Sequence, residues 1–141
     1  MIRRIVPFRL PHWKWLGPDV EGELDFPPSP GLELPTSWTA MVDGDPVAIG
    51  GTWEVWPGRH IAWAAMNAAV RPHMGYVTAA ARRVLDAAEG RVEMTVRKDF
   101  EQGHRWARLL GFQVETPELL HYGRKGETHV GYVRIRCRQP Q

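Results

Sequence analysis

Residues 61–90 read IAWAAMNAAVRPHMGYVTAAARRVLDAAEG, and this stretch decides the fold class. The nearly continuous apolar run from Ile61 to Ala69 is typical of a strand that is covered on both faces. After Pro72 the hydrophobic period changes from two residues to 3.6, which predicts an amphipathic helix. Its apolar stripe consists of Tyr76, Val77, Ala80, Ala81, Val84, Leu85 and Ala87. We expect Gly90 to end this helix as a C′ glycine.

The flanking sequence continues this succession of strands and helices. Alternating apolar residues predict strands, and Asp43-Gly44 and Pro57-Gly58 between them predict tight hairpin turns. The predicted strands are residues 3–8, 38–42, 47–56, 61–70, 91–96, 112–122 and 129–136, and a second helix spans residues 100–110. The predicted order is therefore four strands, a helix, a strand, a helix and two strands.

The first 36 residues differ in composition from the rest of the chain. They hold seven of the twelve prolines, and three of these, Pro27, Pro28 and Pro30, disfavour regular structure. After the first strand we expect one helical turn at residues 11–16 and an irregular segment up to Pro35. We therefore expect a single domain, in which residues 1–36 wrap around a core formed by residues 37–141.

Length and composition exclude several classes of protein. With 141 residues, an apolar fraction of 43% and a charged fraction of 24%, the chain is expected to form one globular domain. Its longest uncharged apolar run, Ile61–Val70, is shorter than the roughly 20 residues of a membrane span. No apolar signal-peptide segment follows Met1. We expect no membrane contact, and the single Cys137 favours a reducing cytoplasm.

The net charge of +2 is unevenly distributed. Residues 1–60 carry 5 basic and 8 acidic groups, whereas residues 61–141 carry 13 and 8. A basic second half can attract a phosphate-bearing ligand, although an ordinary solvated surface is the simpler explanation. The densest basic stretch, residues 134–138, alternates like a strand and contains no aromatic residue. We therefore expect no nucleic-acid partner.

Three motifs, in this order and spacing, resemble the GNAT family of acyl-CoA-dependent N-acetyltransferases. They are the hairpin Val42–Gly50, the sequence Val70-Arg71-Pro72 followed by Gly75, and Gly103–Phe112 with its terminal Gly-Phe. The resemblance covers about residues 37–136. It implies an α/β (α+β) fold with a central mixed, mostly antiparallel sheet of six to seven strands flanked by helices. In this fold the fourth and fifth strands splay apart and form the coenzyme cleft.

The resemblance implies that acetyl-CoA is the co-substrate and that it binds at residues 69–77. A splayed strand leaves backbone groups for the pantetheine amides, and a helix N-terminus attracts the pyrophosphate. Val70 is expected to end the strand, and Gly75 to let the backbone approach the ligand. The full set of expected contacts is Ala69, Val70, Arg71, His73, Gly75, Tyr76 and Val77. This loop is shorter than the family's, and Val77 takes the place of the family's second small residue.

Acyl transfer to an amine needs a base for the ammonium proton and an acid for the leaving thiolate. The family's frequent acid is a tyrosine four residues before the last-helix glycine, a position that Ala107 occupies here. Tyr122 is the expected substitute, with Tyr76 as an alternative, and Glu54 is the expected base. Three histidines are alternative proton acceptors: His60, His104 and His121. No histidine pair has metal-ligand spacing, so we expect no metal.

Three tryptophans near the Pro57-Gly58 turn indicate a candidate contact surface for an acceptor or a partner protein. Strand alternation places Trp53 and Trp56 on opposite faces, while Trp63 lies on the next strand. We expect Trp56 to be the more exposed and to contact an acceptor or a partner protein.

Two functions follow from the resemblance. The first is transfer of an acetyl group from acetyl-CoA to a primary amine of a small molecule or protein. The alternative is a catalytically degenerate GNAT-fold protein that binds another macromolecule. The trimmed N-terminus and short loop are similar to those of small bacteriophage-borne GNAT-like proteins, which would place the chain in a host cytoplasm and make a host enzyme its partner. A homodimer is open under either function.

Overall fold

A computed structural model of the chain describes residues 1–18, 20–21 and 28–137. Part of the irregular segment expected before Pro35 therefore lies outside the described residues. The elements in chain order are β1 (Arg3–Pro7), α1 (Leu10–Trp15), β2 (Val20–Glu21), the 3₁₀ turn η1 (Pro30–Leu32), β3 (Trp38–Val42), β4 (Asp45–Trp56), β5 (Arg59–Asn67), the 3₁₀ helix η2 (Ala68–His73), α2 (Met74–Ala87), β6 (Gly90–Arg97), α3 (Glu101–Leu109), β7 (Gln113–Leu119) and β8 (His129–Arg136).

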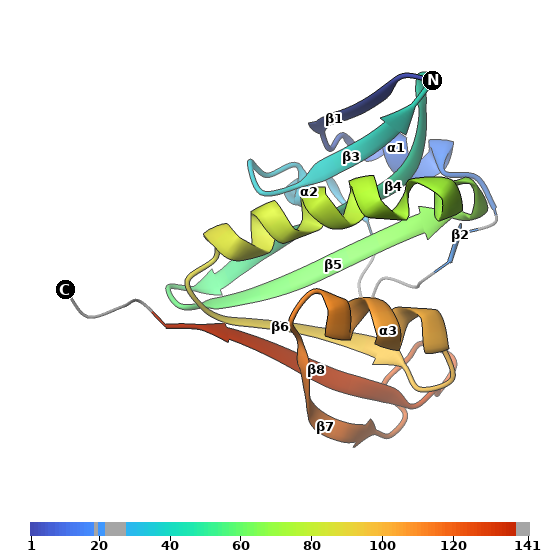
Figure 1. Cartoon of the computed structure of the whole chain (residues 1–141). Helices are drawn as coiled ribbons and strands as arrows, with labels where there is room; N and C mark the ends of the chain where they lie inside the picture. The colour runs from blue at the N-terminus through green and yellow to red at the C-terminus, as the bar shows by residue number, and fades with distance from the viewer. Residues whose placement is uncertain (19, 22–27, 138–141) are drawn as a thin grey trace.

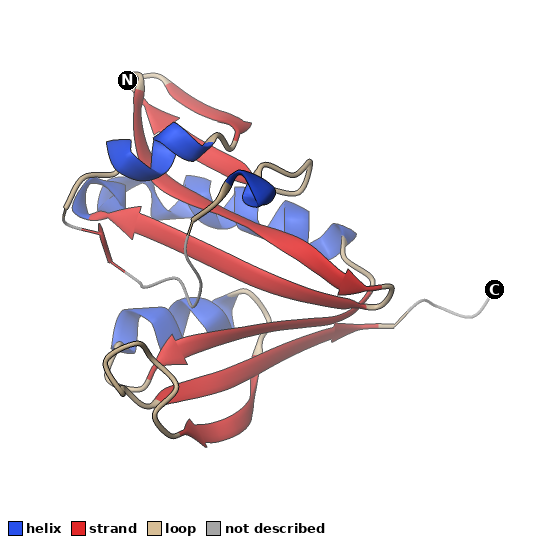
Figure 2. Ribbon diagram, turned by 180° about the vertical axis from the view of Figure 1, so that it is seen from behind, coloured by secondary structure: helices blue, strands red, loops and turns tan. Residues whose placement is uncertain are grey.

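The strands form one mixed sheet in the order β1-β3-β4-β5-β6-β8-β7, and the short β2 pairs with the end of β5. Neighbouring strands are antiparallel except for β5 and β6, which are parallel. Helices α2 and α3 cover one face of the sheet (Figure 1). Helix α1 covers part of the opposite face (Figure 2). The expected fold class is confirmed.

Each face of the sheet has its own apolar core. On the helix α2 side, side chains of both helices pack on β6 and β8, with Val77, Val92 and Phe112 among the buried residues. On the other side, Phe8 and Leu16 from the N-terminal segment pack with residues of β4 and β5. The N-terminal segment therefore covers the face of the sheet that α2 and α3 leave uncovered. The second core lies between this segment and strands β4 and β5.

Strands β5 and β6 separate after a short pairing. Only Arg59–Ile61 pairs with Arg91–Glu93, and the two strands diverge from there, which confirms the expected splay. Gly90 begins β6 with a φ of +89°, and the Arg91 amide donates to the Gly58 carbonyl at 2.8 Å. The prediction that Gly90 ends the helix is wrong: α2 ends at Ala87, with Ala88 as its C-cap. Gly90 is instead where the chain enters the apex of the splay.

The central strand ends at Asn67, three residues before the predicted Val70. The Asn67 side chain accepts a hydrogen bond from the Ala69 amide and donates to the carbonyls of Leu16 and Pro46. These bonds fix Asn67 as the N-cap of η2, which occupies the expected loop as a 3₁₀ helix. The strand boundary is therefore set by partners from two distant segments.

Coverage of the central strand also differs from the prediction. Trp63 and Ala65 are buried on the α1 side. Ala62, Ala64 and Met66 on the other face are only half-buried, because they line a cavity. The continuous apolar run thus reflects a packed core on one face and a hollow on the other.

A buried histidine of α1 makes the stability of the protein depend on pH. His12 Nδ1 lies 3.1 Å from the Arg9 amide nitrogen and 2.7 Å from Thr39 Oγ1, so the ring nitrogen accepts these bonds in its neutral form. Burial lowers the pKa of His12; the Arg9 charge lowers it further and Glu33 opposes the shift. The unfolded chain therefore takes up a proton near pH 6.5 that the folded chain resists.

Stability should consequently be highest above about pH 6.5 and fall below it, at up to about 1.4 kcal/mol per pH unit from this group. Urea unfolding of the wild type and of His12→Gln between pH 5 and 8 measures the effect. We expect the wild type to lose stability relative to the variant as the pH falls. Parallel pH dependences would show that His12 does not titrate with folding.

Candidate functional site

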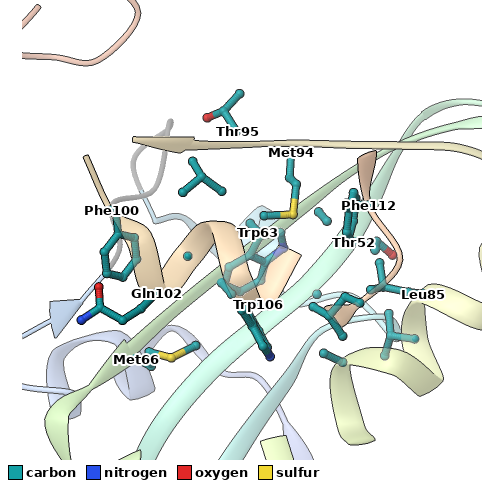
Figure 3. Close-up of a pocket in the computed structure, with 18 of the residues that line it drawn as sticks. Thr52, Trp63, Met66, Leu85, Met94, Thr95, Phe100, Gln102, Trp106 and Phe112 are labelled. Carbon is teal, nitrogen blue, oxygen red and sulfur yellow. The ribbon is translucent and has the colours of Figure 1, made fainter. Parts of the chain in front are cut away.

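A cavity of about 420 Å³ lies between the splayed strands and helices α2 and α3. Its walls are mainly apolar side chains from these four elements and from the residues that flank α3: Ala62, Ala64, Met66, Met74, Ala81, Val84, Leu85, Met94, Val96, Phe100, Trp106, Leu110 and Phe112. Figure 3 shows Phe100, Gln102 and Met66 at one end and Leu85, Phe112 and Thr52 at the other. Met94 and Trp106 lie between the two ends. The site is a long apolar chamber with one end at the open side of the splay.

The cavity reaches both faces of the sheet. Alternation along β6 places Met94 and Val96 on the helix face, and Thr95 and Arg97 on the opposite face. All four residues line the cavity, and so does His129 of β8, which pairs with Arg97. In the part of the chain that the structure describes, the β5 edge from Ala62 to Ala65 has no strand partner on the β6 side. The gap between β5 and β6 is thus a passage through the sheet.

A second hollow, of about 320 Å³, lies over the first turns of α2. Met74, Gly75 and Thr78 form its floor, and Trp106 of α3 forms a wall. Gly75 is exposed, and a Cβ at this position would meet nothing within 4 Å. The positive end of the α2 dipole and the open backbone at Gly75 suit an anion.

The charged side chains at the two hollows also favour an anionic ligand. Arg71 lines the cavity and Arg82 lines the outer hollow, while Arg97, which lines the cavity on the opposite face of the sheet, forms an ion pair with Asp99. Among the described residues, no carboxylate lines either of them. The site therefore favours a ligand that is anionic at its outer end and apolar further in.

Trp106 separates the two hollows, since it lines both. Its Nε1 donates to Thr78 Oγ1 at 2.9 Å and so links α3 to α2. Close packing of α3 on β6 requires Gly103, where a Cβ would lie 2.6 Å from the Phe100 ring and 2.7 Å from Val96. Ala107, at the position of the family's tyrosine, is fully buried, and its methyl side chain cannot donate a proton.

The structure divides the expected coenzyme contacts into three groups. Val70 and Arg71 line the cavity, and Gly75 lines the outer hollow. Ala69 is exposed and Tyr76 half-buried beside them.

The other two expected contacts, His73 and Val77, line neither hollow. His73 is buried, and its Nδ1 accepts a hydrogen bond from Arg3 Nε at 3.0 Å. Val77 is fully buried in the core, so it does not narrow the outer hollow. Coenzyme binding by Val70, Arg71 and Gly75, which line the hollows, stays a prediction. His73 and Val77 can support the site only through their packing in the core.

Neither expected catalytic residue is among the described residues that line the cavity. Glu54 is exposed on β4 opposite His60, whose Nε2 lies 3.1 Å from the Glu89 carbonyl. Tyr122 is exposed after β7, but its ring packs on His129 with a centroid distance of 5.1 Å. Of the two, Tyr122 alone adjoins the site.

His129 is the polar residue that sequence reasoning missed. It is buried at the start of β8, and its Nδ1 lies 3.0 Å from Thr95 Oγ1. An imidazole and a hydroxyl therefore meet at the passage, on the face opposite α2. The register of β6 against β8 creates this pair, and the only signal in the sequence was a histidine that opens an apolar strand.

His104 has a structural role instead. Its Nε2 donates to the Lys98 carbonyl at 2.9 Å, so Nδ1 accepts from the Tyr132 hydroxyl at 2.7 Å. Burial raises the pKa of Tyr132, which keeps the phenol protonated. The pair anchors α3 on β8.

On the β4–β5 hairpin, the side chains of Trp53 and Trp56 have the expected orientations. Trp56 is 57% exposed, with the Arg59 guanidinium 4.7 Å from its ring centroid. Trp53 is half-buried against the α1-side core, and Trp63 is buried in it. The greater exposure of Trp56 is confirmed, and its contact with a partner stays a prediction.

Comparison with known proteins decides the fold family. Over 99% of this chain and 97% of its own, the ribosomal-protein-S18-alanine N-acetyltransferase from Escherichia coli superposes with a TM-score of 0.70 at 13% identity. Ard1 from Thermoplasma volcanium gives 0.63 at 18% identity, over 73% of this chain and 72% of that one. The chain has the GNAT acetyltransferase fold. A GNAT-family acetyltransferase from Bacillus anthracis is also similar, with a TM-score of 0.57 at 13% identity over 71% of this chain and 66% of that one.

The GNAT fold is recognisable here from the structure and from the three motifs. No protein-family model and no curated protein matches the sequence. In the described part of the chain, none of the helices has the length and apolarity to cross a membrane. The same residues contain no cluster of three or more potential metal ligands.

Proposed function

We propose that the chain is an acyl-CoA-dependent N-acyltransferase that transfers an acyl group, acetyl in the simplest case, to a primary amine. The observation that carries the proposal is the passage through the sheet between β5 and β6, lined from both faces. A thioester held in such a passage can be reached from the face opposite the helices. An amine can thus approach the carbonyl without entering the coenzyme's side.

The residues present fit the coenzyme in three places. The pyrophosphate would lie over Gly75 at the α2 N-terminus, near Arg82. The pantetheine arm would pass Trp106, and its amides would bond the free β5 edge between Ala62 and Ala65. Because β2 already pairs with Met66 and Asn67, it shortens the part of this edge that the arm can use.

The reaction would be a direct transfer. The amine nitrogen attacks the thioester carbonyl carbon, a C–N bond forms, and the C–S bond breaks. The ammonium loses its proton to a base, and the CoA thiolate takes one up. His129, held by Thr95 and packed under Tyr122, lines the cavity at the passage and is our candidate for the proton acceptor.

The test is calorimetric titration of the wild-type protein with acetyl-CoA, followed by an assay of thiol release with a panel of primary amines. We expect one molecule of acetyl-CoA to bind per chain with a micromolar Kd. Lack of binding at millimolar acetyl-CoA would refute the proposed function. Binding without thiol release for any amine would leave only a coenzyme-binding protein.

The exposure of Trp56 favours a second function, a GNAT-fold protein that binds another macromolecule. The absence of a proton donor at Ala107 fits the same interpretation. This function needs no acyl-CoA, so a protein that fails the titration and loses a partner on Trp56→Ala would support it. The passage between β5 and β6, however, has no role in this alternative, which is why we place it second.

A further inference from the structure

The cavity continues past the passage, beneath α2. Its lining includes Thr52 of β4 and Trp38 of β3. These strands lie one and two positions beyond β5 in the sheet, on the side away from β6. Under the proposed function, a pantetheine arm that enters between β5 and β6 would end in its thioester at the passage. The part of the cavity under α2 would then lie beyond the arm itself.

The walls of this inner part are buried and almost entirely apolar. Trp38, Ala81, Leu85 and Phe112 are all buried, and Thr52 is the polar side chain among them. Figure 3 shows Thr52, Leu85 and Phe112 together, at the end of the cavity opposite Phe100 and Gln102. Such a surface suits a hydrocarbon, because it offers contact and almost no hydrogen bonds.

An acetyl group would leave this space empty, since it extends only one methyl beyond the carbonyl. Empty apolar space is uncommon in protein interiors, because its lining loses contact partners. The volume of about 420 Å³ belongs to the whole cavity, which the end of the pantetheine arm would share. The apolar part beyond the passage, under α2, suits a donor that carries its own apolar extension.

We propose that the acyl group of the donor is a linear saturated chain longer than acetyl, with its tail between α2 and β4 against Leu85 and Trp38. This proposal rests on the proposed acyl-CoA function and narrows its substrate class. Each methylene that leaves water for such a surface should tighten binding about fourfold. A butanoyl donor, with two more methylenes than acetyl, should bind at least about tenfold more tightly.

Calorimetric titration of the wild type with acetyl-CoA, butanoyl-CoA and hexanoyl-CoA tests the proposal. We expect the Kd to fall along the series, by about fourfold per methylene until the tail reaches the end of the cavity. Equal affinities, or a preference for acetyl-CoA, would overturn the chain-length proposal and leave the acyltransferase function standing. Absence of binding by all three would overturn the proposed function itself.

A matched pair of variants places the tail. Ala81→Leu fills the inner part from α2, whereas Ala87→Leu makes the same change at an exposed position of that helix. Ala81→Leu should weaken the binding of hexanoyl-CoA at least tenfold more than it weakens the binding of acetyl-CoA. Ala87→Leu should change neither. An unchanged chain-length preference in a folded Ala81→Leu protein contradicts the placement; should this variant not fold, the wild-type series alone decides.

Discussion

Gly75→Asp is expected to abolish acetyl-CoA binding, raising the Kd by at least about a hundredfold, while the protein remains fully folded. The carboxylate would stand where the coenzyme pyrophosphate approaches the α2 N-terminus, and like charges at contact distance repel strongly. The fold should tolerate the change because a Cβ at this position meets nothing within 4 Å. An acid in the first helical turn even stabilises a helix, by about 0.3–1 kcal/mol.

Binding and stability should therefore change in opposite directions, which a merely structural glycine would not produce. Calorimetry measures the Kd, and a thermal melt measures the stability. Gly75→Asn is the matched control, with the same shape and no charge, and we expect it to lose much less affinity. An acetyl-CoA affinity of Gly75→Asp within threefold of the wild type would remove the pyrophosphate from this site.

Gly90→Ala is expected to reduce the free energy of unfolding by about 3 kcal/mol or more. Gly90 has a φ of +89°, a region that costs other residues about 1–3 kcal/mol. A Cβ there would also lie 2.5 Å from the Gly58 carbonyl oxygen, a backbone atom that cannot turn aside. Relieving the overlap would move the β4–β5 hairpin away from β6 at the apex of the splay.

Gly75→Ala is the matched control for this substitution. It places the same methyl on an exposed helical glycine with open space around it, and it should stabilise the protein by up to about 1 kcal/mol. Urea unfolding of the two variants gives the comparison. A loss of less than 1 kcal/mol for Gly90→Ala would mean that the apex adjusts easily and that the close approach of Gly90 to Gly58 is not required.

The fold could be predicted from the sequence wherever one segment carries its own pattern. The alternation in 47–56 and the 3.6-residue period after Pro72 gave strand β4 and helix α2. The end of α3 agrees with the helix predicted over residues 100–110: the Gly111 amide donates to the Arg108 carbonyl, and the Phe112 amide donates to the Ala107 carbonyl. In each case the residues that decide the element lie within a few positions of it.

Predictions failed where distant segments decide. The end of β5 depends on hydrogen bonds from Asn67 to carbonyls of Leu16 and Pro46, which no local pattern shows. The sequence predicts Gly90 as a helix terminator, because its contact with Gly58 forms only in the folded sheet. A glycine in the sequence indicates that the backbone can adopt a positive φ there, but it does not say which contact requires this conformation.

The candidate site was predictable only in part for the same reason. Gly75 could be found from the strand–turn–helix pattern, because helix and turn are adjacent in sequence. The contact between Thr95 and His129 depends on the pairing of β6 with β8, two strands that α3 and β7 separate in the sequence. Glu54 is predicted as the base from its strand alone, and it is not among the described residues that line the cavity. The bacteriophage origin, the partner protein and the homodimer stay predictions.

Binding of an acyl-CoA in the passage between β5 and β6 is tested most directly by mapping the bound site with ¹H–¹⁵N correlation spectra during a titration with acetyl-CoA. We expect the backbone amides of Met74, Gly75 and Tyr76 and the indole N–H of Trp106 to shift together and to saturate at one equivalent. The Trp56 indole, at the far hairpin, should stay in place. Shifts confined to the Trp56 hairpin, with those of α2 and Trp106 unmoved, would contradict the assignment of this cavity as the acyl-CoA site.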